Sequence, residues 1–204
     1  MHCSLVTAKA LRFRFGVVRT RAVFALLTGT LLGCGSAPRP NLFTIPPAAS
    51  GTADLNELPL VVVADVTLPA YARDRRIAIS GEANQIVRDH MNRWVSDPGE
   101  MVAEALAQRL RSLVSNAWTR PLPDGLKPVY TIDVKFDTLL QTQEGAALLA
   151  GQLLLKSAGG SLASDPFTIR EASNGASDYP AVLGEALDQL AEQVFRSLPQ
   201  KAPG

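Results

Sequence analysis

The sequence predicts an α+β domain, a two-layer sandwich in which a mostly antiparallel sheet carries two amphipathic helices on one face. Val129–Asp137 alternates apolar and polar residues throughout, which is typical of a strand with one buried face. Two segments, one after Asp97 and one after Ser177 and Asp178, repeat apolar residues at spacings of three and four, as amphipathic helices do. Short connections join the strands after the first helix, so we expect those strands to be antiparallel neighbours.

Further strands are expected on both sides of the first helix. The run that ends at Leu68 begins apolar on both faces and then alternates, which indicates a central strand that becomes half-exposed. A last short strand follows Pro166 and carries Phe167 and Ile169. The other predicted strands are Leu42–Ile45, Leu58–Leu68, Arg76–Ser80, Ile86–Val95 with Ile86 and Trp94 on one face, and Ala147–Lys156.

Both helices carry start or stop signals. Asp97 precedes Pro98 and stands three residues before Glu100, an arrangement that caps the first turn of a helix. Pro199 ends the second helix, and residues 200–204 are expected to be a flexible tail. The buried stripe of the first helix is predicted to hold Val102, Ala105, Leu106, Leu110, Leu113, Val114 and Ala117.

The charge is divided unevenly along the chain. The 204 residues carry a formal net charge of +1, with 47% hydrophobic and 19% charged residues, a composition too apolar for disorder. Residues 1–33 hold five Lys and Arg and no acid, whereas residues 34–204 hold 15 Lys and Arg against 19 Asp and Glu, a formal −4. We therefore expect a basic targeting segment and a mildly acidic body that does not bind nucleic acid.

The N-terminal segment reads as a lipoprotein signal peptide, residues 1–33. The uncharged run Ala22–Leu32 is too short to span a bilayer and suits the apolar core of a signal peptide. It leads into Leu31-Leu32-Gly33-Cys34, which resembles a bacterial lipobox. Cleavage between Gly33 and Cys34 would free the amine of Cys34. The alternatives are an ordinary signal peptide with an incidental cysteine and a short buried helix.

Acylation of Cys34 is the predicted membrane anchor. Its thiol accepts a diacylglycerol and its freed amine an N-acyl chain such as palmitate, and two or more chains make membrane attachment lasting. Residues 34–41 are then the acylated cysteine and a short tether, and residues 42–199 a single domain. Gly35, in place of an aspartate, favours the periplasmic face of the outer membrane over the inner membrane.

Catalytic and metal-binding arrangements are not found in the sequence. Without Cys34, the mature chain has no free cysteine and one histidine, His90, too few for a typical zinc site. Asp133 and Asp137 lie four residues apart on one strand, about 13 Å, too far to share a proton. We therefore predict no catalytic residue, no metal and no cofactor beyond the covalent lipid.

The basic run Arg73–Arg76 has two possible roles. It is either a solvated turn or a contact for phosphate groups.

The chain resembles the ABC-type transport auxiliary lipoprotein family. The resemblance covers nearly the whole mature chain, and the order and spacing of its motifs carry it. Two segments depart from the family pattern, namely Ala72–Arg76 and the turn Trp94–Pro98, which is one residue longer. The matching segments are the lipobox, Leu42–Pro47, Val66–Tyr71, Ile77, Asn92–Trp94, the Asp97-Pro98 pair, Val129–Leu139, the helix with Leu106, Leu110 and Leu113, and the closing amphipathic helix.

The resemblance implies a non-enzymatic accessory subunit of an MCE/ABC-type lipid transport system that supports membrane integrity. Its expected partners are an MCE-domain protein, an ABC transporter complex and the lipid membrane. Whether the protein also forms a homo-oligomer is left open by the sequence. The candidate contact residues are Leu68, Pro69, Tyr71 and Trp94, with core packing as the alternative for Tyr71 and Trp94. The alternative functions are an envelope-assembly or structural lipoprotein independent of a transporter, and a small lipid carrier.

Overall fold

The computed structural model describes residues 38–48, 60–114, 116–157, 159–173 and 178–199. The predicted signal peptide, its cleavage site at Gly33, the acylated Cys34 and the tail 200–204 lie outside the described residues. Residues from Arg39 onward belong to one compact unit.

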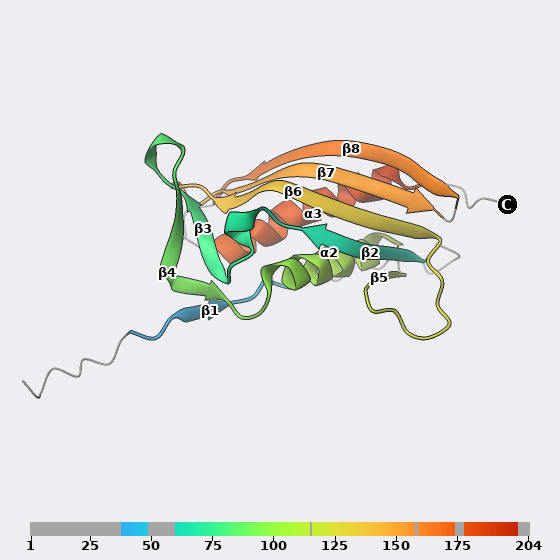
Figure 1. Cartoon of the computed structure of the whole chain (residues 1–204), viewed down its shortest axis with the longest axis horizontal. Coiled ribbons are helices and arrows are strands. Elements are labelled where there is room, and N and C mark those ends of the chain that lie inside the picture. The colour runs from blue at the N-terminus through green and yellow to red at the C-terminus, as the bar shows by residue number, and fades with distance from the viewer. Residues whose placement is uncertain (1–37, 49–59, 115, 158, 174–177, 200–204) are drawn as a thin grey trace, which may run out of the picture. The chain divides into compact units, whose positions relative to one another are not determined.

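Three long antiparallel strands form one side of the sheet (Figure 1). They are β6 (Tyr130–Gln141), β7 (Ala147–Ser157) and β8 (Gly160–Glu171), and each pairs with the next along almost its full length. The predicted alternation of β6 is confirmed, because its apolar residues are buried on one face and its polar residues are at least partly exposed on the other.

Shorter strands extend the sheet from the other edge of β6. Strand β2 (Val61–Thr67) runs parallel to the first half of β6, and β5 (Ala117–Thr119) runs parallel to the start of β2. Strand β3 (Arg76–Ser80) meets the end of β6, pairs antiparallel with β4 (Ile86–Trp94), and β4 pairs parallel with β1 (Asn41–Phe43). Two short 3-10 helices, η1 (Ala70–Ala72) and η2 (Glu82–Asn84), lie between these strands.

Two helices, α2 (Pro98–Val114) and α3 (Tyr179–Ser197), cover one face of the sheet. Helix α2 packs on β2 and β5, α3 packs on β7 and β8, and the two helices contact each other. The predicted two-layer α+β architecture is therefore confirmed. Among the described residues, none of the helices combines the length and apolar character needed to span a bilayer.

Large apolar side chains fill the layer between the sheet and the helices. The rings of Phe136 and Phe167 meet edge to face with centroids 5.4 Å apart, and those of Trp94 and Tyr179 are 5.9 Å apart. Such pairs add to the stabilisation from apolar burial. Other fully buried side chains in this layer are Tyr130, Leu106, Leu110, Ile132, Leu149, Leu153, Leu155, Leu183, Leu187 and Leu190.

Three local predictions differ from the structure. Helix α2 ends at Val114, and Ala117, expected on its stripe, begins strand β5. Strand β8 begins at Gly160, well before Phe167, and continues through Pro166, since the exposed edge of a sheet tolerates a missing N–H. Ile86 is exposed whereas Trp94 is buried, because one residue of β3, Ile77, lies opposite four residues of β4, 89–92, and this irregularity interrupts the alternation.

Candidate functional site

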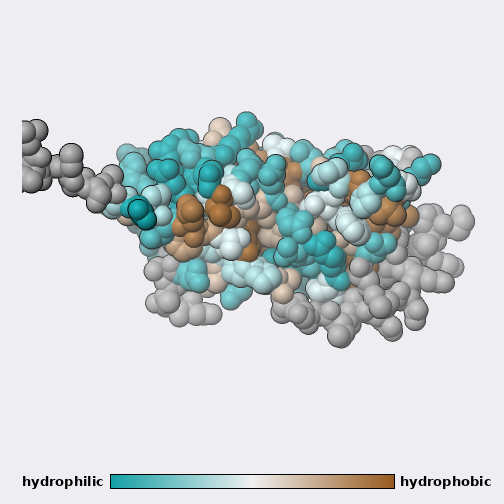
Figure 2. Space-filling model, turned by 90° about the horizontal axis from the view of Figure 1, so that it is seen from below, coloured by the Kyte–Doolittle hydropathy of each residue, from teal (hydrophilic) through white to brown (hydrophobic). Residues whose placement is uncertain are grey.

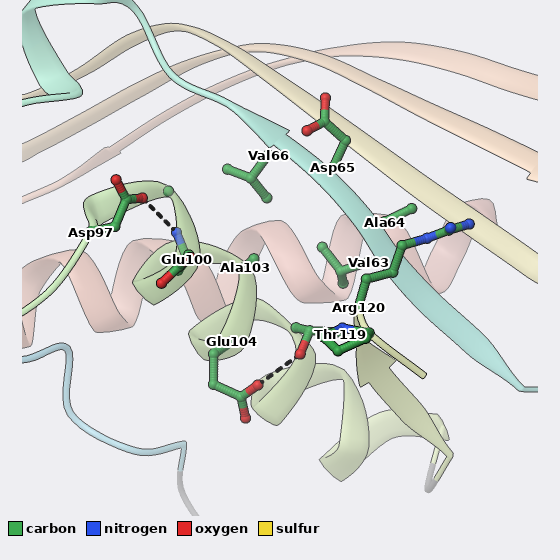
Figure 3. A pocket seen from close by; sticks show the side chains of 12 residues that line it. Val63, Ala64, Asp65, Val66, Asp97, Glu100, Ala103, Glu104, Thr119 and Arg120 are labelled. Carbon is green, nitrogen blue, oxygen red and sulfur yellow. Dashed lines mark hydrogen bonds between the residues drawn. The ribbon is translucent and has the colours of Figure 1, made fainter. Parts of the chain in front are cut away.

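The candidate site is an open groove beside the first turns of α2, which we call the α2 groove (Figure 3). It has a volume of about 550 Å³, and β2, α2 and the end of β5 form its walls. In Figure 3, α2 contributes Glu100, Ala103 and Glu104, while Arg120 follows β5 at the opposite rim. The residues of β2 that line it are Val63, Ala64, Asp65 and Val66.

The sequence places the start of α2 at this groove. The carboxylate of Asp97 accepts a hydrogen bond of 3.1 Å from the backbone N–H of Glu100, which confirms the predicted cap. A Cβ on Gly99 would lie 3.1 Å from Asp97 Oδ1 and 3.6 Å from the backbone oxygen of Val66. The glycine therefore leaves room for the Asp97 carboxylate that caps the first turn of the helix.

Glu104 joins the two walls of the groove. Its carboxylate accepts hydrogen bonds from Thr119 Oγ1 at 3.1 Å, Arg111 Nη2 at 2.7 Å and Gln108 Nε2 at 3.2 Å. Partial burial opposes ionisation, but these hydrogen bonds hold the pKa of Glu104 below its ordinary value. Glu104 is therefore a fixed negative charge that ties α2 to β5.

One edge of β2 is open along the groove. Strand β5 pairs with β2 only from Val61 to Val63, whereas β2 continues to Thr67. A register shift between Val63 and Asp65 lies where this pairing stops. Beyond Val63, none of the described strands pairs with this edge. An open edge of this kind binds an extended polypeptide through main-chain hydrogen bonds.

The rim of the groove is mostly acidic. Asp65, Asp97 and Glu100 are exposed, Glu104 is half-buried, and Arg120 is the basic residue among those lining the groove. Figure 3 shows the Asp65 side chain directed to the opposite side of β2 from Val63 and Val66. This charge balance favours a ligand that carries basic side chains.

Two shallower hollows extend the α2 groove. The first, of about 320 Å³, shares Val66, Asp97 and Gly99 with the groove and adds Leu68 and Arg73. The second, of about 270 Å³, lies along the other side of α2 and includes Thr44, Ile45 and Ser96 beside Glu100 and Glu104. The three hollows thus lie around the N-terminal half of α2, in which Glu100 is the exposed residue.

The structure separates the four predicted contact residues into two kinds. Leu68 and Trp94 are core residues, 4% and 6% exposed, and Trp94 packs against Tyr179. Pro69 and Tyr71 are half-exposed, and the Tyr71 hydroxyl accepts a hydrogen bond of 3.2 Å from the backbone N–H of Leu139. Burial agrees with the core alternative for Trp94, and Leu68 is buried as well although it lines the first hollow. The contact itself stays a prediction, with Pro69 and Tyr71 as its half-exposed members.

The other polar candidates lie in ion pairs or on the surface. Asp133 is paired with Lys156, and Asp137 lies 3.2 Å from Lys135 Nζ. His90 is exposed, and the described residues hold no group of three or more potential metal ligands.

Within the basic run Arg73–Arg76, Asp74 is paired with Arg76. The hydrogen bonds from Arg76 lower the pKa of the Asp74 carboxyl to about 2. This pairing holds the run as a structured turn.

Arg109 is a structural residue that the sequence analysis missed. It is 3% exposed inside the helical layer, where it donates hydrogen bonds to the backbone oxygens of Gly184, Ala105 and Pro46. Its Nε lies 2.9 Å from Asp188 Oδ1. The available signal was its position on the apolar stripe of α2, where a charged residue needs buried partners.

The fold and the groove define a two-layer α+β domain with an open binding surface. More particularly, the chain belongs to the family described as ABC-type transport auxiliary lipoprotein component, which it matches over residues 41–195. The resemblance inferred from the sequence is therefore confirmed. Membership supports an accessory role in ABC-type transport and a location in the cell envelope.

Solved structures show the same fold at low sequence identity. A crystal structure titled only as an uncharacterized protein is 18% identical, with a TM-score of 0.65, and the match covers 79% of this chain and 100% of that one. The crystal structure of protein XCC0632 from Xanthomonas campestris is 14% identical, with a TM-score of 0.59, and the match covers 77% of this chain and 96% of that one. No curated protein matches the chain.

Proposed function

We propose that this protein is a non-enzymatic accessory subunit of an MCE/ABC-type intermembrane lipid transport system. Acyl chains on Cys34 hold it at the periplasmic face of the outer membrane, where it supports membrane integrity. The observation that carries the proposal is the family match over residues 41–195, which spans nearly the whole domain.

The packed interior favours an adaptor over a lipid carrier. A carrier needs an apolar cavity between the sheet and the helices, of the size of an acyl chain. That layer instead holds large side chains such as Tyr130, Phe136 and Leu187, each less than 2% exposed. The accessible concave surface is the α2 groove, whose mixed polar and apolar walls suit a polypeptide better than a lipid tail.

The α2 groove is the proposed docking site for the MCE partner. An extended segment of the partner would add to the open edge of β2 beyond Val63, and basic side chains on that segment would face Asp97, Glu100 and Glu104. In the sequence, Pro69 and Tyr71 lie between Leu68 and Arg73, which line the first of the two smaller hollows.

Substitution of Cys34 by alanine is expected to abolish the anchor. Without the thiol, no diacylglycerol can be attached, so the variant should lose labelling by radioactive palmitate and leave the outer-membrane fraction. Cys3→Ala is the matched control, because it removes the other cysteine of the chain and lies within the predicted signal peptide. Palmitate labelling that persists in the Cys34 variant would contradict the assignment of the anchor.

Reversing one charge in the groove is expected to weaken the partner complex. Glu100→Lys places a positive charge opposite the proposed basic segment and should lower recovery of the MCE protein about tenfold, equivalent to about 1.4 kcal/mol. The measurement is affinity purification from cross-linked membranes, followed by mass spectrometry. Glu192→Lys on the exposed face of α3 is the matched control.

The outcomes separate the transport role from the docking site. Wild-type protein that recovers no MCE or ABC component would remove the transport assignment and favour the transporter-independent envelope role. Equal recovery by the Glu100 and Glu192 variants would remove the α2 groove as the docking site and leave the transport assignment in place.

A further inference from the structure

Exposed apolar side chains gather at one end of the domain. Of the seven large hydrophobic side chains that are exposed among the described residues, five lie on β1, on β4 or directly after β4. They are Leu42 at 58%, Ile86 at 41%, Val87 at 49%, Met91 at 39% and Val95 at 48% exposed. Figure 2 shows apolar atoms at the surface beside hydrophilic ones toward this end.

The register places three of the side chains at this end on one outer face. Leu42 of β1 is paired with Arg93 of β4, and the N–H of Val95 donates to the backbone oxygen of Phe43 at 2.9 Å. Because side chains alternate along a strand, Arg93 and Val95 point away from the buried Trp94 between them. Leu42, Arg93 and Val95 therefore share a surface that combines apolar groups with a positive charge.

The hairpin between β3 and β4 carries apolar side chains on both of its faces. Val87 and Ile86 are consecutive, so they point to opposite sides of the hairpin, and both are exposed. Strand β3 joins β6 through one register pair, Ile79 with Gln141, and β4 joins β1 only at residues 92–94, so the tip of the hairpin projects beyond β6. The turn itself is polar, with Glu82, Asn84 and Gln85 exposed, and the exposed apolar residues Ile86 and Val87 follow directly after it. The tip therefore presents polar and apolar groups together, as contact with the headgroup layer of a membrane requires.

The same end has a positive charge balance. Residues 73–93 hold five arginines against three acids, although residues 34–204 as a whole have a formal charge of −4. Arg73 Nε donates to the backbone oxygen of Leu68 at 2.9 Å, and Arg75 Nε donates to that of Trp94 at 2.9 Å. Backbone carbonyls hold these side chains in place without neutralising them. Such fixed cations attract anionic lipid headgroups.

The anchor lies close to this end along the chain. Asn41, the first residue of β1, is seven positions after Cys34, and a fully extended chain of that length spans about 25 Å at most. We infer that the β1–β4 end, namely β1, the β3–β4 hairpin and Val95, lies on the phospholipid surface that holds the acyl chains of Cys34. The hairpin tip enters the headgroup layer, and the arginines bind phosphate groups. This inference rests on the anchor of the proposed function.

The test uses a fluorescent probe at the hairpin tip of the acylated protein. Val87→Cys introduces a unique thiol, because Cys3 is removed with the signal peptide and Cys34 is acylated, and a nitrobenzoxadiazole group is attached to it. In vesicles of phosphatidylethanolamine and phosphatidylglycerol, we expect blue-shifted emission and quenching by spin-labelled lipid. Leu126→Cys, at an exposed apolar residue between β5 and β6, is the control and should emit as in water.

A second variant separates the contribution of charge. Arg88→Gln combined with Arg93→Gln should lower the ratio of inserted to free probe at residue 87 about tenfold or more. Vesicles without phosphatidylglycerol should have the same effect. Both results would support a contact with anionic headgroups.

Three results would overturn the inference. Equal, water-like emission at residues 87 and 126 in vesicles that retain the protein would remove the lipid contact while leaving the anchor intact. Shielding of residue 87 only after the MCE protein is added would assign the surface to a protein partner. Failure of the protein to remain on vesicles would remove the anchor, and the inference with it.

Discussion

Replacement of Gly151 by valine is expected to abolish the folded domain. A Cβ at this position would lie 2.0 Å from the backbone oxygen of Lys135 and 3.0 Å from Phe136 Cα. Both atoms belong to the backbone of β6, which cannot move away without breaking its pairing with β7. Gly151 is paired with Phe136 on one side and Phe167 on the other, at the edge-to-face ring contact in the core.

The expected loss is comparable to the whole stability of a domain. We expect Gly151→Val to cost more than about 4 kcal/mol and Gly151→Ala to be strongly destabilising as well, since the Cβ alone produces the clash. Urea unfolding followed by far-ultraviolet circular dichroism measures both. Gly159→Ala is the control, because its Cβ would have Ser157 Oγ as its nearest contact at 3.8 Å, and we expect a change within about 0.5 kcal/mol. A stable Gly151→Ala protein would contradict the close approach of β6 and β7.

Replacement of Arg109 by methionine is expected to destabilise the domain by about 3 kcal/mol. Methionine keeps much of the side-chain length but leaves the backbone oxygens of Gly184 and Pro46 without their donor and Asp188 without its ion pair. When one partner of a buried interaction is removed, most of the lost folding free energy comes from the polar groups that are left unpaired. Burial lowers the pKa of Arg109, and the carboxylate of Asp188 opposes this shift by favouring the charged guanidinium.

Urea unfolding measures this loss, and hydrogen exchange locates it. Because Arg109 links α2 to the segment after β1 through the oxygen of Pro46, we expect faster exchange at the amides of Thr44 and Ile45 in the variant than at β7. Arg196→Met, on the exposed side of α3, is the matched control and should change stability by less than about 0.5 kcal/mol. An Arg109→Met protein as stable as this control would show that the buried hydrogen bonds contribute no net stability.

The sequence predicted the elements in which the pattern of apolar residues repeats many times. The alternation in β6 and the apolar stripes of α2 and α3 repeat often enough to exclude other structures. Strand β5 was missed because three residues carry no measurable period. The parallel pairing of β2 with β6 was also missed, since pairing depends on which edges meet in space and alternation does not encode it.

The α2 groove could not be read from the sequence for a related reason. It exists because β5 stops pairing with β2 at Val63 while β2 continues, and that difference in length appears only when both strands are aligned. For Trp94 the sequence leaves two roles open, because an aromatic residue at the end of a strand can either pack in the core or contact a partner. Tyr179, whose ring packs against that of Trp94 in the core, is distant from it in the sequence, so this contact could not be predicted.

Pro166, in the edge strand β8, affects whether two copies of the protein can pair through their sheets. It is exposed, it offers no N–H at the middle of β8, and its backbone oxygen accepts a hydrogen bond of 3.2 Å from Gln193 Nε2 of α3. Proteins held at a surface have a high local concentration, and this promotes pairing between exposed edge strands of neighbouring copies. Pro166 interrupts the exposed edge of β8 near its middle, which disfavours strand-to-strand pairing with a second copy.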